Sequence, residues 1–373
     1  MGISVPASVL SAAPVRDQRI DLLRGIALIS MTLNHLPGRY LHFVRDLFGF
    51  VSFAEVFVFL SGLVVGYVYS FTLVKQGVPG LWRKIRARAR LIYSYHLSVF
   101  FLLFMVSYAV PAVKPFWYKA MIPFYEEQIL ALIAGVFLFY APIGANLLPL
   151  YVVFILGAVL FLRAAHAGRH VRALLFALAM WGAAQLHLFY RAEVLVNRFI
   201  PMHWAIFDPM AWWLLFAAGL YLGLRKYRGV QISPLLQRRL LYLAAPMVAF
   251  LFSWRHGWLA LPHQGQLFNH LTGLQNLGAL RLLHFTMWSI MILYIGRHFS
   301  LEKWRLLRPF GYIGMHSLQV YSWHVCMIFL LYFTIDFWNS DLYWLHYAAI
   351  ALLLLSLWLP AYLHSRYQRA RAR

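Results

Sequence analysis

Apolar runs long enough to cross a membrane recur along this chain, and short clusters of arginine and lysine separate them. A helix needs about 20 apolar residues to span the hydrocarbon core, because each residue adds about 1.5 Å. The pattern predicts an all-α polytopic membrane protein of about ten transmembrane helices, forming a single transmembrane domain over residues 1–373. The predicted spans are 20–36, 50–72, 91–111, 147–162, 171–188, 207–224, 239–254, 278–296, 312–333 and 343–364.

The positions of the basic clusters predict the orientation of these helices. Loops rich in lysine and arginine face the cytoplasm. With ten spans, all the main clusters fall on one side, so both termini are expected in the cytoplasm. These clusters are the N-terminal segment 1–19, residues 83–90, 163–172, 225–239 and 297–308, and the basic tail 365–373.

A further apolar run at 127–141 is bounded by Pro123 and Pro142. If this run crossed the membrane, every later basic cluster would lie outside, contrary to the positive-inside rule. We therefore expect a re-entrant or interfacial helix there.

The formal net charge of +22 has to be read against this topology. In a soluble protein such a charge would suggest nucleic acid as a partner, but here the basic residues lie between spans, where they orient the chain in lipid. Membrane lipid is therefore expected around the protein, and nucleic acid is not expected as a partner. His166 and His170 share the i,i+4 spacing of metal ligands, but no carboxylate or cysteine accompanies them, so we predict no metal site.

The first predicted span carries a polar stripe. Asp21, Arg24, Thr32 and His35 recur at helical spacing and share one face. Ionisable groups inside a membrane are costly and therefore mark candidate functional sites. Arg24 and His35 are separated by about 16 Å along a helix axis. The alternative is an interfacial Asp21–Arg24 pair and a histidine that simply ends the helix.

The second predicted span begins near Glu55 and continues through Gly62 and Gly66. The two glycines form a small surface that allows close approach of another helix. Because the first two spans are antiparallel, His35 and Glu55 are expected at similar depth, and a His–Glu pair would favour a general base. The alternative is that Glu55 only caps its helix.

Two further groups of residues are candidates for binding. The span 312–333 presents Ser317, Tyr321 and His324 on one polar face, which hydrogen bonds between helices would explain equally well. The basic run 83–90 is either a membrane anchor or a site for the phosphates of a nucleotide-containing donor.

Four motifs carry a resemblance to a known family. The sequence DLLRGIALISMTLNH places an arginine and a histidine eleven residues apart, and VFVFLSGLVVG follows in the next span. An arginine-rich entry to the third span and GYIGMHSLQVYSWH complete the series. This order resembles the membrane acyltransferase-3 superfamily, and within it the OpgC branch, whose members add succinyl groups to osmoregulated periplasmic glucans.

The resemblance implies an enzyme of the bacterial inner membrane. It would transfer succinyl from succinyl-CoA, a co-substrate and not a bound cofactor, to glucose hydroxyls of a periplasmic glucan acceptor. His35 would be the general base, with Glu55 and Arg24 as further catalytic residues. The donor would be bound by residues of the same motifs and of the first span, namely Asp21, Ser61, Arg83, Arg86, Arg90, Ser317, Tyr321 and His324.

Two other functions stay open at this point. The enzyme could instead acetylate another envelope polysaccharide. From a different class, the polar stripe could line the path of a small-solute transporter. The sequence also leaves the oligomeric state open, including a homo-oligomer.

Overall fold

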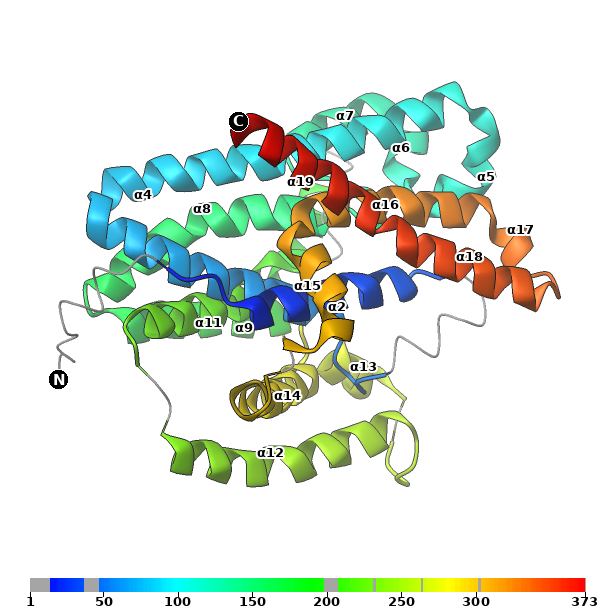
Figure 1. Cartoon of the computed structure of the whole chain (residues 1–373). Helices are drawn as coiled ribbons and strands as arrows, with labels where there is room; N and C mark the ends of the chain where they lie inside the picture. The colour runs from blue at the N-terminus through cyan, green and yellow to red at the C-terminus, as the bar shows by residue number, and fades with distance from the viewer. Residues whose placement is uncertain are drawn as a thin grey trace.

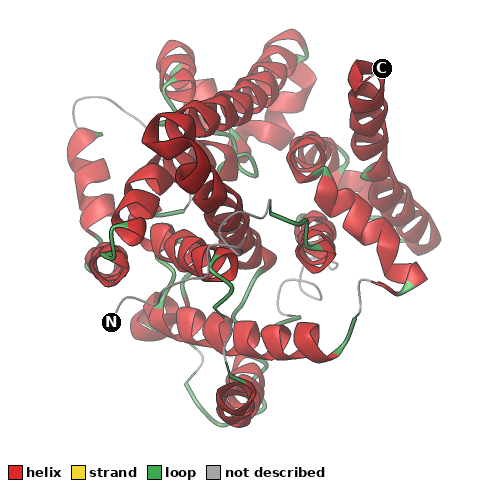
Figure 2. Ribbon diagram, turned by 60° about the vertical axis from the view of Figure 1, so that its left-hand side comes forward, coloured by secondary structure: helices red, strands yellow, loops and turns green. Residues whose placement is uncertain are grey.

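The computed structural model describes residues 14–36, 47–197, 207–230, 233–262, 264–300 and 303–372. Every regular element in these ranges is helical, which confirms the predicted all-α class (Figure 2). Four helices form the centre: α2 (Gln18–Leu33), α4 (Phe53–Ala109), α8 (Leu147–His166) and α11 (Pro209–Tyr227). α4 packs against each of the other three, and these helices run side by side (Figure 1).

The remaining helices surround this centre. α15 (Arg308–Met315) and α16 (Ser317–Phe333) pack on α2, while α9 (His170–Gln185) packs on α11. α12 (Pro234–Arg255) and α14 (Ala279–His298) contact each other at one edge (Figure 1). The other elements are α5 (Lys114–Trp117), α6 (Ile122–Glu126), α7 (Gln128–Val136), α10 (Leu188–Val196), α13 (Gln266–Thr272), α17 (Ile335–Trp338), α18 (Tyr343–Ser356), α19 (Trp358–Ala372) and the 3₁₀ turns η1 (Pro111–Val113), η2 (Tyr118–Ala120) and η4 (Arg305–Leu307).

α4 contains two of the predicted spans in one bent element. Gly77 interrupts it with φ 63° and ψ −170°, a conformation that glycine adopts without a side-chain clash. Pro79 follows two residues later and donates no backbone N–H. The arms 53–76 and 78–109 fold back on each other (Figure 1), and this hairpin supplies two walls of the site described below.

Several of the described helices are long and apolar enough to cross a membrane. α4, α8, α12, α14 and the combined segment Tyr343–Arg371 make five, and α9 with α10, bent by 61°, make a sixth if counted as one span. These helices indicate a membrane protein. The full count of ten spans and the cytoplasmic location of both termini stay predictions.

Part of the run at 127–141 forms a short helix, and its re-entrant or interfacial position stays a prediction. α7 has nine residues, Gln128–Val136. Nine residues give about 14 Å of helix, roughly half the thickness of the hydrocarbon core. α7 is therefore too short to be a span by itself.

The predicted glycine surface of α4 is confirmed, and its partner is α11. A Cβ added at Gly62 would lie 2.2 Å from the Phe216 carbonyl oxygen, and one at Gly66 would lie 2.2 Å from that of Leu220. Gly219 of α11 meets the Phe59 carbonyl oxygen of α4 at the same distance. The two backbones are therefore in direct contact, which holds the first arm of α4 in place.

Candidate active site

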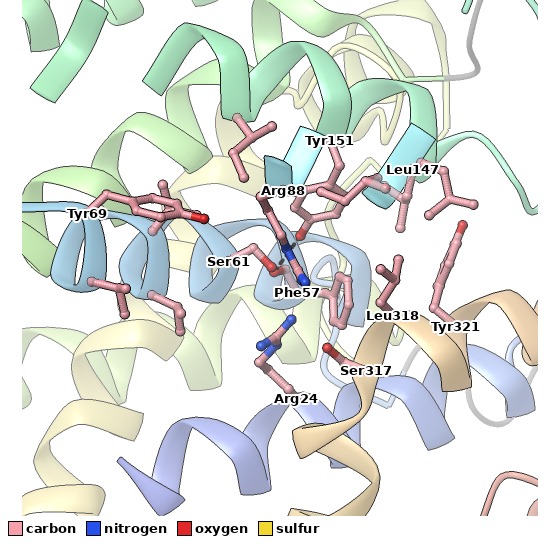
Figure 3. Close-up of a pocket in the computed structure, with 16 residues that line it drawn as sticks. Arg24, Phe57, Ser61, Tyr69, Arg88, Leu147, Tyr151, Ser317, Leu318 and Tyr321 are labelled. Atoms are coloured by element: carbon pink, nitrogen blue, oxygen red, sulfur yellow. Dashed lines mark hydrogen bonds between the residues drawn. The ribbon is translucent and has the colours of Figure 1, made fainter. Parts of the chain in front are cut away.

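A cavity of about 260 Å³ lies between α2, both arms of α4, α8 and α16. Most of its wall is apolar, which suits a site within a membrane protein. Seven polar side chains reach it from four helices, as Figure 3 shows: Arg24, Ser61, Tyr69, Arg88, Tyr151, Ser317 and Tyr321. Four of these were predicted from the sequence, and the fold brings them together from three separate segments.

Two arginines dominate the charge of this cavity. Arg24 comes from α2 and Arg88 from the second arm of α4, and their guanidinium groups point toward each other (Figure 3). Arg24 lies over the ring of Phe57, 5.4 Å from its centroid, and its Nε atom is buried without a hydrogen-bond partner. Among the described residues that line the cavity, none is acidic. Two partly buried cations without a carboxylate create a site for an anion.

Two tyrosines hold the cavity wall through backbone carbonyls. Tyr151 donates to the Phe57 carbonyl oxygen at 2.9 Å. Tyr321 donates to the Gly144 carbonyl oxygen at 2.5 Å and stacks on Phe57 with ring centroids 6.2 Å apart. Tyr321 also contacts the ring of His324, at 5.8 Å between centroids. Tyr321 therefore connects the cavity to a pair of histidines behind it.

His35 and His324 form that pair, with ring centroids 5.3 Å apart in an edge-to-face arrangement. Neither is among the residues that line the cavity. The Nδ1 atom of His35 lies 2.7 Å from the Met31 carbonyl oxygen. Because a carbonyl only accepts, Nδ1 carries the proton, and Nε2 of the neutral ring has a free lone pair. This is the tautomer that a general base at Nε2 requires.

The expected pairing of His35 with Glu55 is wrong. One carboxylate oxygen of Glu55 accepts from Arg281 at 2.7 Å. The other accepts from the Ser52 backbone N–H at 3.1 Å and from the Ser52 hydroxyl. Glu55 lies at the third position of α4, where a glutamate reaches back to the capping serine, and its fully buried charge is balanced by Arg281. Glu55 caps its helix, as in the alternative, and in addition forms a buried ion pair that neither interpretation predicted.

Asp21 does not form the pair with Arg24 that the alternative interpretation of the polar stripe proposed. Its carboxylate pairs with Arg16 at 2.6 Å, and not with Arg24 on the same helix. Asp21 is buried but does not line the cavity. Arg24 is therefore left free to bind an anion in the cavity.

The basic run of α4 contributes a residue other than those predicted. Arg83, Arg86 and Arg90 are exposed and do not line the cavity, whereas Arg88 does. Arg88 follows the buried Ile85 by three residues, so it shares the inward face of the helix. Helical phase within the run could have identified Arg88. Tyr151 was also missed, because a single tyrosine in an apolar span carries no comparable signal.

The sequence was compared with known families, curated proteins and solved structures. A family model described as OpgC protein matches residues 16–369. No curated protein and no solved structure matches the chain. The matched region contains every helix that lines the cavity and both histidines of the pair.

Proposed function

Because the chain belongs to the OpgC protein family, we propose that it is an acyl-CoA-dependent O-acyltransferase that adds succinyl groups to glucose hydroxyls of osmoregulated periplasmic glucans. The observation that carries the succinyl assignment is the pair of arginines in the cavity, Arg24 and Arg88. The family supports a glucan-modifying enzyme. The positive charge of the cavity favours succinyl over an uncharged acyl group as the group transferred.

Succinyl differs from acetyl by a free carboxylate at its far end. Arg24 and Arg88 offer that carboxylate two planar sets of N–H donors, in a cavity without an acidic side chain among its described lining residues. An acetyl group would leave both guanidinium groups without a counter-ion. The hydroxyls of Ser61 and Ser317 line the same cavity and are available to the polar atoms of the donor.

The reaction then follows from the tautomer of His35. Its Nε2 atom removes the proton of a glucose hydroxyl as the sugar oxygen attacks the thioester carbonyl carbon. The new C–O bond forms, the C–S bond breaks, and the proton passes from His35 to the CoA thiolate. Tyr321 and Phe57 wall the cavity on the side of the histidines, so these rings have to turn before the acyl carbon reaches His35.

In the predicted topology the two substrates approach from opposite sides of the membrane. The basic clusters put the start of α2 in the cytoplasm, where acyl-CoA is present, and put His35 toward the periplasm, where the glucan acceptor is. In this arrangement the protein lies in the bacterial inner membrane and moves an acyl group across part of its thickness.

The test is mass spectrometry of periplasmic glucans from cells without the chain, with the wild-type chain, and with His35→Ala. We expect succinyl additions only with the wild type, while His35→Ala accumulates in the membrane to the same level. Acetyl additions in place of succinyl additions would mean that the donor is acetyl-CoA and not succinyl-CoA. Unchanged glucans would reject this acceptor, and full activity of His35→Ala would reject the base.

A further inference from the structure

The proposed reaction leaves a charge to be balanced. Once His35 has taken a proton it is an imidazolium within a buried part of the protein. The charged groups on the helices around His35 are either paired with other residues or far from its ring. Glu55 pairs with Arg281, Asp21 pairs with Arg16, and Arg24 lies about 16 Å away along α2. Among the described residues, the titratable group that contacts the His35 ring is His324.

The hydrogen bonds of His324 define its tautomer. Its Nδ1 atom lies 2.9 Å from the Thr32 hydroxyl oxygen, and that hydroxyl donates its one proton to the Leu28 carbonyl oxygen at 2.9 Å. Thr32 must therefore accept from His324, so Nδ1 of His324 carries the proton. The lone pair is on Nε2.

That Nε2 atom is one of several buried histidine nitrogens without a partner among the described residues, and it belongs to the ring beside His35. His324 is 1% exposed, and its Nε2 is buried without a hydrogen-bond partner among the described residues. A buried acceptor without a donor is unfavourable, and such groups in native structures commonly have a functional cause. The Thr32 hydroxyl, itself 1% exposed, keeps this lone pair available.

We propose that His324 is a positioning residue that stabilises the protonated form of His35 by accepting a hydrogen bond from it at Nε2. The inference rests on the proposed function. The proton leaves the glucose hydroxyl for Nε2 of His35 as the C–O bond forms. The new N–H then turns from the sugar oxygen to Nε2 of His324, and the proton passes from His35 to the CoA thiolate as the C–S bond breaks. His324 thus has the role that the sequence suggested for Glu55, which is to favour His35 as the general base.

The experiment uses the full chain in lipid nanodiscs, with succinyl-CoA and purified periplasmic glucan, and initial rates measured as a function of pH. His324→Leu removes the acceptor. His324→Gln keeps an oxygen acceptor near the position of Nε2, and Thr32→Val removes the group that fixes the tautomer. His96→Gln is the matched control, because His96 is equally buried but bonds to the Gly135 carbonyl oxygen of α7.

We expect His324→Leu to lower kcat by about 10- to 100-fold, since the lost hydrogen bond is one to a charged group. The KM values for succinyl-CoA and for the glucan should change little. The acidic limb of the pH–rate profile should move to lower pH, because His35 then binds its proton less well. His324→Gln should restore part of kcat, Thr32→Val should shift the profile in the same direction by less, and His96→Gln should match the wild type.

An unchanged profile in His324→Leu would overturn the proposal, as would a rise in KM without a shift of the acidic limb. If His324→Leu fails to fold, Thr32→Val and His324→Gln decide the question by the same two readouts. Full activity of His35→Ala would refute the proposed base itself, and His324 would then have no imidazolium to stabilise.

Discussion

The carboxylate of Glu55 and the guanidinium of Arg281 form a buried ion pair, 2.7 Å apart, that joins the first arm of α4 to α14. The Glu55 side chain is fully buried and that of Arg281 is 14% exposed. Arg281 also donates to the Thr272 carbonyl oxygen at 2.8 Å. Loss of either partner would leave a buried charge without compensation.

Glu55→Ala is therefore expected to lower the free energy of unfolding by about 3–5 kcal/mol. The double variant Glu55→Leu with Arg281→Met removes both charges and should recover most of this loss. The measurement is denaturant unfolding of the purified protein in detergent. If Glu55→Gln instead kept full stability and shifted the pH profile of acyl transfer, the carboxylate would act on His35 after all.

The contact between α4 and α11 gives a second prediction. A Cβ at Gly219 would lie 2.2 Å from the Phe59 carbonyl oxygen, so the backbones would have to separate. Gly219→Ala should destabilise the protein by about 1–3 kcal/mol through overpacking. Gly182→Ala is the control, because nothing lies within 4 Å of its Cβ position. Equal stability of the two variants would show that the two helices can move apart freely.

These two relationships show what the sequence could and could not predict. Helical periodicity alone puts Gly62 and Gly66 on one face, and that face is indeed a helix contact. Periodicity does not say which helix packs there, so α11 was not predicted. For Glu55, the antiparallel arrangement of the first two spans predicted a depth similar to that of His35. It did not predict the rotation of α4 about its own axis, which decides where the Glu55 side chain points. Arg281, more than 200 residues away, is brought to Glu55 by the tertiary fold alone.

The N-terminus of α2 gives a pH-dependent prediction. Asp17 pairs with Arg19 at 2.9 Å and with Lys226 of α11. Burial raises the pKa of Asp17, but the hydrogen bonds from Arg19 and Lys226 outweigh it and hold the pKa well below its usual range. Since the pKa is lower in the folded state, the carboxylate stabilises the fold above the unfolded value of about 4, and this contribution is lost as the pH falls further.

Asp17→Asn should consequently lower Tm at neutral pH, and its difference from the wild type should shrink below about pH 4. Thermal unfolding of the purified protein across this range is the measurement. Asp336→Asn is the control, because Asp336 is exposed. A difference that stays constant down to low pH would mean that the amide, and not the loss of charge, causes the destabilisation.

The choice of donor rests on Arg88, which the sequence did not single out. Arg88→Leu removes one of two guanidinium groups facing the proposed carboxylate of the succinyl group. A hydrogen bond to a charged group contributes about 1.5–3 kcal/mol, so kcat/KM for succinyl-CoA should fall roughly 10- to 100-fold. Turnover of acetyl-CoA, which lacks that carboxylate, should change little. Lys84→Ala on the same arm is the control, since Lys84 is exposed and does not line the cavity. Equal losses with both donors would mean that Arg88 binds a part of CoA that they share, and the arginine pair would then no longer explain why succinyl is preferred.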